Sequence, residues 1–179
     1  MKKQTLLLVL IAASFQLQAQ KLFATKTGQI KFNASSPLEQ IVAINNQVDS
    51  KMIAKTGQIV FSALIKSFKF ENQLMEDHFN ENYMESSKIP KAEFKGYITN
   101  VSSVDFSKNG TYPITVEGTL GMHGVSQKVS AFGSMIIENG KPSITGSFKV
   151  KIKDYGITGL YIGEKIASEA EISVNCKYE

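Results

Sequence analysis

Residues 170–179 read AEISVNCKYE, and apolar and polar side chains alternate along this stretch without a break. Successive side chains of a β-strand point to opposite faces, so Ala170, Ile172, Val174, Cys176 and Tyr178 share one face. The stretch therefore predicts a half-buried strand with Cys176 on its inner face. Because this is the only cysteine, an internal disulfide is excluded and the fold depends on its apolar core.

The same two-residue period recurs along most of the chain. It is clearest in 28–34, 92–99, 114–122 and 144–153, and three further strands are predicted at about 39–48, 58–66 and 127–137, where apolar residues fall on both faces. Asn109-Gly110 and Asn139-Gly140 lie between strands and predict tight antiparallel hairpins, because both residue types tolerate positive φ. The count predicts an all-β fold, an eight-stranded antiparallel barrel or sandwich. A barrel of this size either is filled by its own side chains or holds one small ligand, as in lipocalins.

Five glycines lie on the predicted inner face. They are Gly28, Gly96, Gly118, Gly133 and Gly146. Strand glycines commonly curve a sheet. Five missing side chains among large apolar residues would also leave a cavity, and the sequence favours neither interpretation over the other.

A segment of different composition separates the third predicted strand from the fourth. Within 70–87, the apolar residues recur at helical spacing and the acidic residues occupy the opposite side. We expect a short amphipathic helix that ends before Pro90 and lies over the barrel. It either completes the core or covers a ligand entrance.

The N-terminus has the pattern of a secretory signal. Lys2 and Lys3 precede an apolar run over 5–15, and Ala19 provides a small residue before a cut. The run is about half the roughly 20 residues that a membrane span needs. We therefore predict a signal peptide over residues 1–19, a barrel domain over residues 20–179, and a periplasmic or extracellular location after cleavage.

Charge and motifs exclude several function classes. All 20 basic residues are lysine, dispersed along the chain against 16 acidic residues, so the arginine fork that reads nucleic acids is missing and no nucleic-acid partner is expected. No GxSxG, GxxxxGK[ST], GxGxxG or HExxH motif occurs, and no cofactor, metal or catalytic site is predicted. For His78 and His123 we expect ordinary hydrogen-bonding or surface roles, and for Asp154 the start of a turn.

Six stretches, taken together and in order, resemble the YceI-like family of secreted lipid-binding proteins. They are GQIKF (28–32), FKFENQLM (68–75), EDHF (76–79), SKIPKAEFKG (87–96), GTLGMHGV (118–125) and KDYGI (153–157). The resemblance implies a lipocalin-like eight-stranded antiparallel barrel whose apolar tunnel holds a polyisoprenoid or similar long amphiphile, with no catalytic residues. This agrees with the independent strand count.

The candidate ligand-binding residues are large and apolar. They are Phe61, Phe68, Phe70, Leu74, Met75, Phe79, Tyr83, Phe94, Leu120 and Phe148, with the helical insert at one mouth of the barrel. The partner expected on this interpretation is a long-chain isoprenoid, a quinone or a fatty-acid-like lipid. Transient contact with a membrane or membrane protein, and a homodimer, are further partners that the sequence leaves open.

Two alternatives to a lipid carrier stay open at this stage. One is a non-catalytic interaction or stress-response module whose barrel is packed with its own side chains. The other is an enzyme on the same barrel, acting on an apolar substrate with His78 or Asp154 as acid or base.

Overall fold

A computed structural model describes residues 21–179 of the chain. The predicted signal peptide, residues 1–19, lies outside the described residues, so it stays a prediction. Within residues 21–179, none of the helices has the length and apolar character that crossing a bilayer requires.

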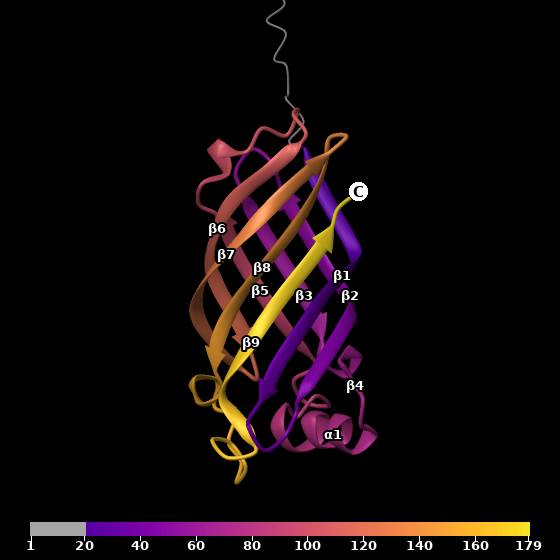
Figure 1. The fold of residues 1–179 in the computed structure, drawn as a ribbon, viewed down its shortest axis with the longest axis vertical. Helices are drawn as coiled ribbons and strands as arrows, with labels where there is room; N and C mark the ends of the chain where they lie inside the picture. The colour runs from indigo at the N-terminus through magenta and orange to yellow at the C-terminus, as the bar shows by residue number, and fades with distance from the viewer. Residues whose placement is uncertain (1–20) are drawn as a thin grey trace, which may run out of the picture.

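Eight long strands form one closed antiparallel barrel (Figure 1). They are β1 (Leu22–Ser35), β2 (Val42–Ile53), β3 (Gln58–Leu64), β5 (Lys91–Ile98), β6 (Gly110–Met122), β7 (Val125–Glu138), β8 (Lys141–Lys151) and β9 (Ile166–Lys177). Each strand pairs with its sequence neighbour among these eight, and β1 pairs with both β9 and β2, which closes the ring. The predicted eight-stranded antiparallel barrel is confirmed.

The barrel forms because the alternating strands need to bury one face only. The strand with the clearest alternation is β9, which pairs with β8 on one side and with β1 on the other. The three less regular strands exist, but their bounds shift: the strand expected at 39–48 is β2 at Val42–Ile53. The prediction began it too early because 36–41 is apolar at Leu38 and Ile41 yet forms the turn after β1.

Only one of the two predicted Asn-Gly turns is present. Asn139 and Gly140 both have positive φ, 52° and 75°, and join β7 to β8. The Asn109-Gly110 turn was predicted wrongly, because residues 99–109 form a longer connection and Gly110 already begins β6. Asn109 instead accepts a hydrogen bond from the backbone N–H of Asn139, at 2.8 Å, so one Asn-Gly pair braces the other. The sequence analysis missed the tight turn at His123-Gly124, with φ of 52° and 76°.

The helical insert lies between β3 and β5, as predicted, but it is less regular than one helix. It comprises a 3-10 turn η1 (Ile65–Ser67), a two-residue strand β4 (Lys69–Phe70) paired with β2, the helix α1 (Gln73–His78) and a π-helical turn η2 (Phe79–Tyr83). Figure 1 shows α1 across the lower end of the barrel. Further 3-10 turns are η3 (Val101–Ser103) and η4 (Ile152–Tyr155). Asp154 lies in a turn, as expected, but the turn begins at Ile152 and not at Asp154.

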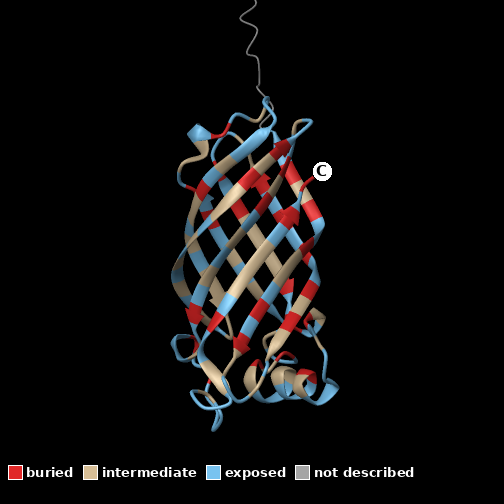
Figure 2. Ribbon diagram, in the orientation of Figure 1, coloured by how far each residue is buried: buried red, intermediate tan, exposed pale blue. Residues whose placement is uncertain are grey.

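Buried residues gather at the two ends of the barrel, with partly buried ones between them (Figure 2). At the end that holds the C-terminus, Met52, Met135, Ile137, Cys176 and Tyr178 belong to one tightly buried cluster. The other cluster lies at the end that carries α1. The wall between them is partly accessible, which indicates that the interior is not filled throughout.

Candidate functional site

The interior of the barrel contains a cavity of about 470 Å³. This is within the range of ordinary ligand pockets, roughly 300–1,000 Å³. Its walls come from every long strand of the barrel except β2, and from α1, η2 and the loop before β9. The innermost lining residues, Ile59, Ile114 and Ile144, belong to the buried cluster at the C-terminal end of the barrel.

Inward-facing positions of the strands supply the wall. They recur with period two, as Ile30, Phe32 and Ala34 in β1 or Phe148 and Val150 in β8, and nearly all are apolar. Polar neighbours such as Lys31 and Lys149 are exposed on the outside. The cavity is therefore a direct product of the sequence alternation.

The five inner-face glycines divide into two groups. A side chain at Gly96 or Gly118 would meet Cζ of Phe94, at 2.6 and 2.5 Å, so the Phe94 ring already occupies the space that these paired glycines leave. The Cys176 sulfur similarly occupies the space beside Gly28. In contrast, Gly133 and Gly146 line the cavity directly. The cavity interpretation therefore applies to Gly133 and Gly146, and the curvature interpretation to Gly28, which lies between two register shifts of the β1–β2 pairing.

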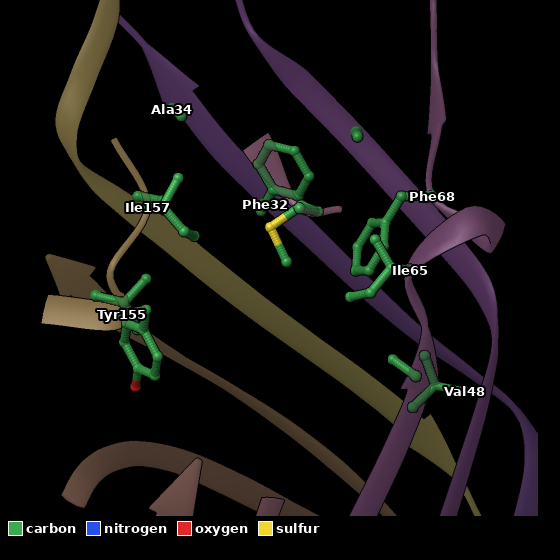
Figure 3. Packing of buried hydrophobic residues seen from close by; sticks show 12 residues of the cluster. Phe32, Ala34, Val48, Ile65, Phe68, Tyr155 and Ile157 are labelled. Carbon is green, nitrogen blue, oxygen red and sulfur yellow. The ribbon is translucent and has the colours of Figure 1, made fainter. Parts of the chain in front are cut away.

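Four phenylalanines seat the insert on the barrel. The ring centroid of Phe32, on β1, lies 5.5 Å from that of Phe68, 5.6 Å from that of Phe70 and 5.2 Å from that of Phe79. Figure 3 shows Phe32 and Phe68 beside Ile65, all within the buried cluster at this end. Such aromatic pairs are favourable beyond their buried area.

Polar contacts fix the start of the insert. The Asn72 side chain accepts from the Leu74 N–H at 2.9 Å, which caps α1. The carboxylate of Glu76, only 10% exposed, forms an ion pair with Lys69 and accepts from the Phe70 N–H. A buried carboxylate needs such partners, so Glu76 ties α1 to β4.

A second segment, residues 156–165, meets the insert at the mouth of the cavity. A Cβ on Gly159 would lie 2.7 Å from Cε1 of Tyr83, so the two segments touch there. Burial and then the neighbouring Tyr161 raise the pKa of Tyr83 above its ordinary value. The charged or imidazole side chains that line the cavity within the described residues are Glu39, His78 and Lys165, all at this mouth.

The insert is also bound to the β6–β7 turn. His123 Nδ1 lies 3.1 Å from the Tyr155 carbonyl oxygen, and its Nε2 lies 3.5 Å from Glu85. The Lys88 ammonium, which donates a hydrogen bond to Glu85, holds the pKa of that carboxyl below its ordinary value. His123 therefore has the structural role that the sequence analysis expected.

The opposite end of the cavity is closed by satisfied polar groups and packed side chains. Ser50 and Tyr178 share a hydrogen bond of 2.8 Å, and Ser50 donates to the Val60 carbonyl. Burial raises the pKa of the Cys176 thiol to about 11, so it is an unreactive core group near neutral pH.

Comparisons with known proteins agree with this geometry. A family model for the YceI-like domain matches residues 15–178. The chain belongs to the YceI-like family. Two solved structures share the fold of this YceI-like barrel: a polyisoprenoid-binding domain from Saccharophagus degradans implicated in plant cell wall breakdown, and BcnA from Burkholderia cenocepacia.

The likeness of both structures to the YceI-like chain lies in the fold. The Saccharophagus domain is 11% identical, with a TM-score of 0.74 over 90% of this chain and 99% of that one. BcnA is 14% identical, with a TM-score of 0.70 over 85% of this chain and 96% of that one. No curated protein sequence is significantly similar to this chain.

All ten candidate ligand-binding residues lie on the wall of the YceI-like cavity. Phe61, Phe94, Leu120 and Phe148 come from β3, β5, β6 and β8, whereas Phe68, Phe70, Leu74, Met75, Phe79 and Tyr83 come from the insert or the residues just before it. That they contact a ligand stays a prediction.

The sequence analysis missed lining residues of two kinds. Phe32 and Ile172 continue the alternation of their strands, so the same parity argument would have found them. Tyr161, Ile162 and Lys165 lie in the irregular segment before β9, where no periodicity shows which side chains turn inward.

Proposed function

We propose that this chain is a secreted or periplasmic binding protein that holds a polyisoprenoid or similar long-chain lipid in the barrel cavity. The observation that carries the proposal is a cavity lined almost entirely by apolar side chains, reaching from the mouth beside α1 to Ile59, Ile114 and Ile144. The polyisoprenoid-binding domain of the same fold from Saccharophagus degradans supports it.

Binding would be driven by removal of apolar surface from water. Each Å² buried is worth about 25 cal/mol before the cost of ordering the ligand. A chain ligand buries area along its whole length, so no strong polar clamp is required. The same reasoning predicts low sensitivity of affinity to any single polar residue.

The test is native mass spectrometry of the protein purified from its own host, with extraction and identification of any released lipid. Ala131 lines the cavity, whereas Ser130 is exposed on the outside of the same strand. Ala131→Phe should abolish lipid retention, and Ser130→Phe should leave it unchanged. A protein that stays free of lipid after incubation with isoprenoids, or equal retention by both variants, would contradict the proposal.

The alternative of a packed interaction or stress-response module predicts an interior filled by its own side chains. The cavity of about 470 Å³ favours lipid binding over that alternative. For the enzymatic alternative, the His78 and Asp154 side chains are exposed and form no hydrogen bond within the described part of the chain. A binding protein therefore accounts for the site better than an enzyme.

Location and partners belong to the same proposal. Export predicts that the host's periplasmic or extracellular fraction contains a chain shortened by about the length of the signal segment. Transfer of lipid predicts brief contact with a membrane or membrane protein, measurable as ligand exchange with vesicles. A homodimer would appear as a doubled mass in light scattering.

A further inference from the structure

The polar end of any chain-like ligand is restricted to one place in the cavity. Beyond the mouth, the lining side chains are apolar, and the polar groups at the closed end already have partners: Ser50 and Tyr178 share a hydrogen bond, and Ser50 donates to the Val60 carbonyl. A head group placed there would lose its hydrogen bonds with water and gain none. The head group therefore belongs at the mouth, with the tail directed inward.

The mouth offers little to a negative head group. Lys165 is the one ammonium on the cavity wall within the described residues, and its Nζ lies 5.2 Å from the Tyr161 ring centroid. Glu39 lines the same opening. The sequence contains no arginine, so no bidentate clamp for a phosphate or carboxylate is available.

The insert adds further negative charge at this end of the barrel. Residues 70–87 contain five carboxylates and no lysine. Glu76 and Glu85 have lysine partners outside that segment, Lys69 and Lys88. Glu71, Asp77 and Glu81 are exposed and form no ion pair within the part of the chain that the structure describes. Together with Glu39, these carboxylates outnumber the single ammonium on the cavity wall, which disfavours a phosphate or carboxylate head group at this end of the barrel.

We propose that the ligand carries an uncharged, hydrogen-bonding head group, such as an alcohol, an amide or a quinone, and that the mouth discriminates against the anionic analogue of the same chain length. This inference rests on the proposed lipid-binding function. Asn72 and Tyr161 on the wall of the mouth offer an amide and a hydroxyl to such a head group. Charge at the mouth selects the ligand class, while the apolar tunnel provides affinity.

The experiment compares a polyprenol with its monophosphate, matched in chain length, for binding to delipidated full-length protein. Competition against an apolar fluorescent probe at low salt gives both affinities. The alcohol should bind at least about fivefold more tightly, and the ratio should shrink as salt screens the repulsion. An equal or tighter affinity for the monophosphate would overturn the inference.

Two charge reversals locate the effect. Glu39→Lys at the mouth should reduce the discrimination, whereas Glu117→Lys, an exposed position on the outer face of β6, should preserve it. Equal changes in both variants would also overturn the inference. If neither lipid binds, the proposed function fails and the inference fails with it. If both lipids bind but the monophosphate binds equally or more tightly, the inference alone fails.

Discussion

Gly133 pairs with Gly146 across β7 and β8, and the pair forms a part of the cavity wall that has no side chain. The two positions differ in what a methyl group would meet. At Gly133 it would press on backbone atoms of the paired strand, the Thr145 carbonyl oxygen and the Gly146 Cα, the latter at 2.9 Å. At Gly146 the nearest atom would be the Phe132 carbonyl oxygen, at 3.2 Å.

This asymmetry predicts different results for two matched substitutions. Gly133→Ala should lower the free energy of unfolding by about 1–3 kcal/mol, because the backbone of β8 cannot move aside without cost. Gly146→Ala should cost less than about 1 kcal/mol but narrow the cavity, and so weaken binding of long chains. Urea unfolding and lipid titration of both variants measure this. Equal destabilisation would show that the difference in backbone contacts between the two positions has no energetic consequence.

The buried thiol predicts a loss of stability at alkaline pH. The pKa of Cys176 is raised by burial from an ordinary 9.0 to about 11, so the folded chain retains a proton that the unfolded chain releases. Stability is therefore fully present below pH 9 and falls as pH rises from about 9 to 11, by about 2–3 kcal/mol from this group. Burial also raises the pKa of Tyr178, which adds a loss above about pH 10.

Urea unfolding at a series of pH values between about 7 and 10 measures this loss of stability. Cys176→Ala should be less stable than the natural chain at neutral pH, because it loses a packed sulfur beside Gly28, but should lose less stability as pH rises. Parallel pH profiles for the two proteins would contradict the assignment to Cys176.

The strand content could be predicted from sequence because a barrel wall buries one face, and residues such as Ile172 and Val174 show that alternation directly. The same parity is enough to place Phe94, Leu120 and Phe148 on the inner face from sequence alone, whereas the strand of Phe61 has apolar residues on both faces. The family resemblance provides the lipid tunnel as an expectation.

The remaining features depend on contacts between segments distant in sequence. The Asn109-Gly110 turn was wrongly predicted because Asn109 uses its side chain to brace Asn139 across the barrel end. The contact of Gly159 with Tyr83 likewise joins segments more than seventy residues apart, and no local pattern indicates it. The space beside Gly96 and Gly118 is filled because the Phe94 ring lies there, and the sequence does not indicate the direction of that ring.

The Glu76 carboxylate predicts how firmly the insert is attached. Glu76→Ala removes the acceptor for Lys69 and for the Phe70 N–H, so α1 should detach more readily from β4. We expect a loss of about 1–3 kcal/mol in the local opening free energy. Hydrogen exchange should quicken over 69–83 while β6 and β7 stay protected. Glu81→Ala, an exposed position on η2, is the matched control and should leave the exchange rates unchanged.

The Gly159–Tyr83 contact predicts control over ligand release. Gly159→Ala places a methyl group against the Tyr83 ring, so the segment 156–165 should move away from the insert and widen the mouth. The dissociation rate of a bound lipid should rise several-fold, with a change in unfolding free energy below about 1 kcal/mol. Thr158→Ala, the exposed neighbour, controls for a general loop effect.

A double variant separates this contact from other effects at the mouth. Adding Tyr83→Leu to Gly159→Ala removes the obstructing ring, so the double variant should release lipid at a rate closer to that of Tyr83→Leu alone. The coupling arises because the methyl group at position 159 has nothing left to press against. If the effects of the two substitutions on the dissociation rate simply add, the contact does not control the mouth.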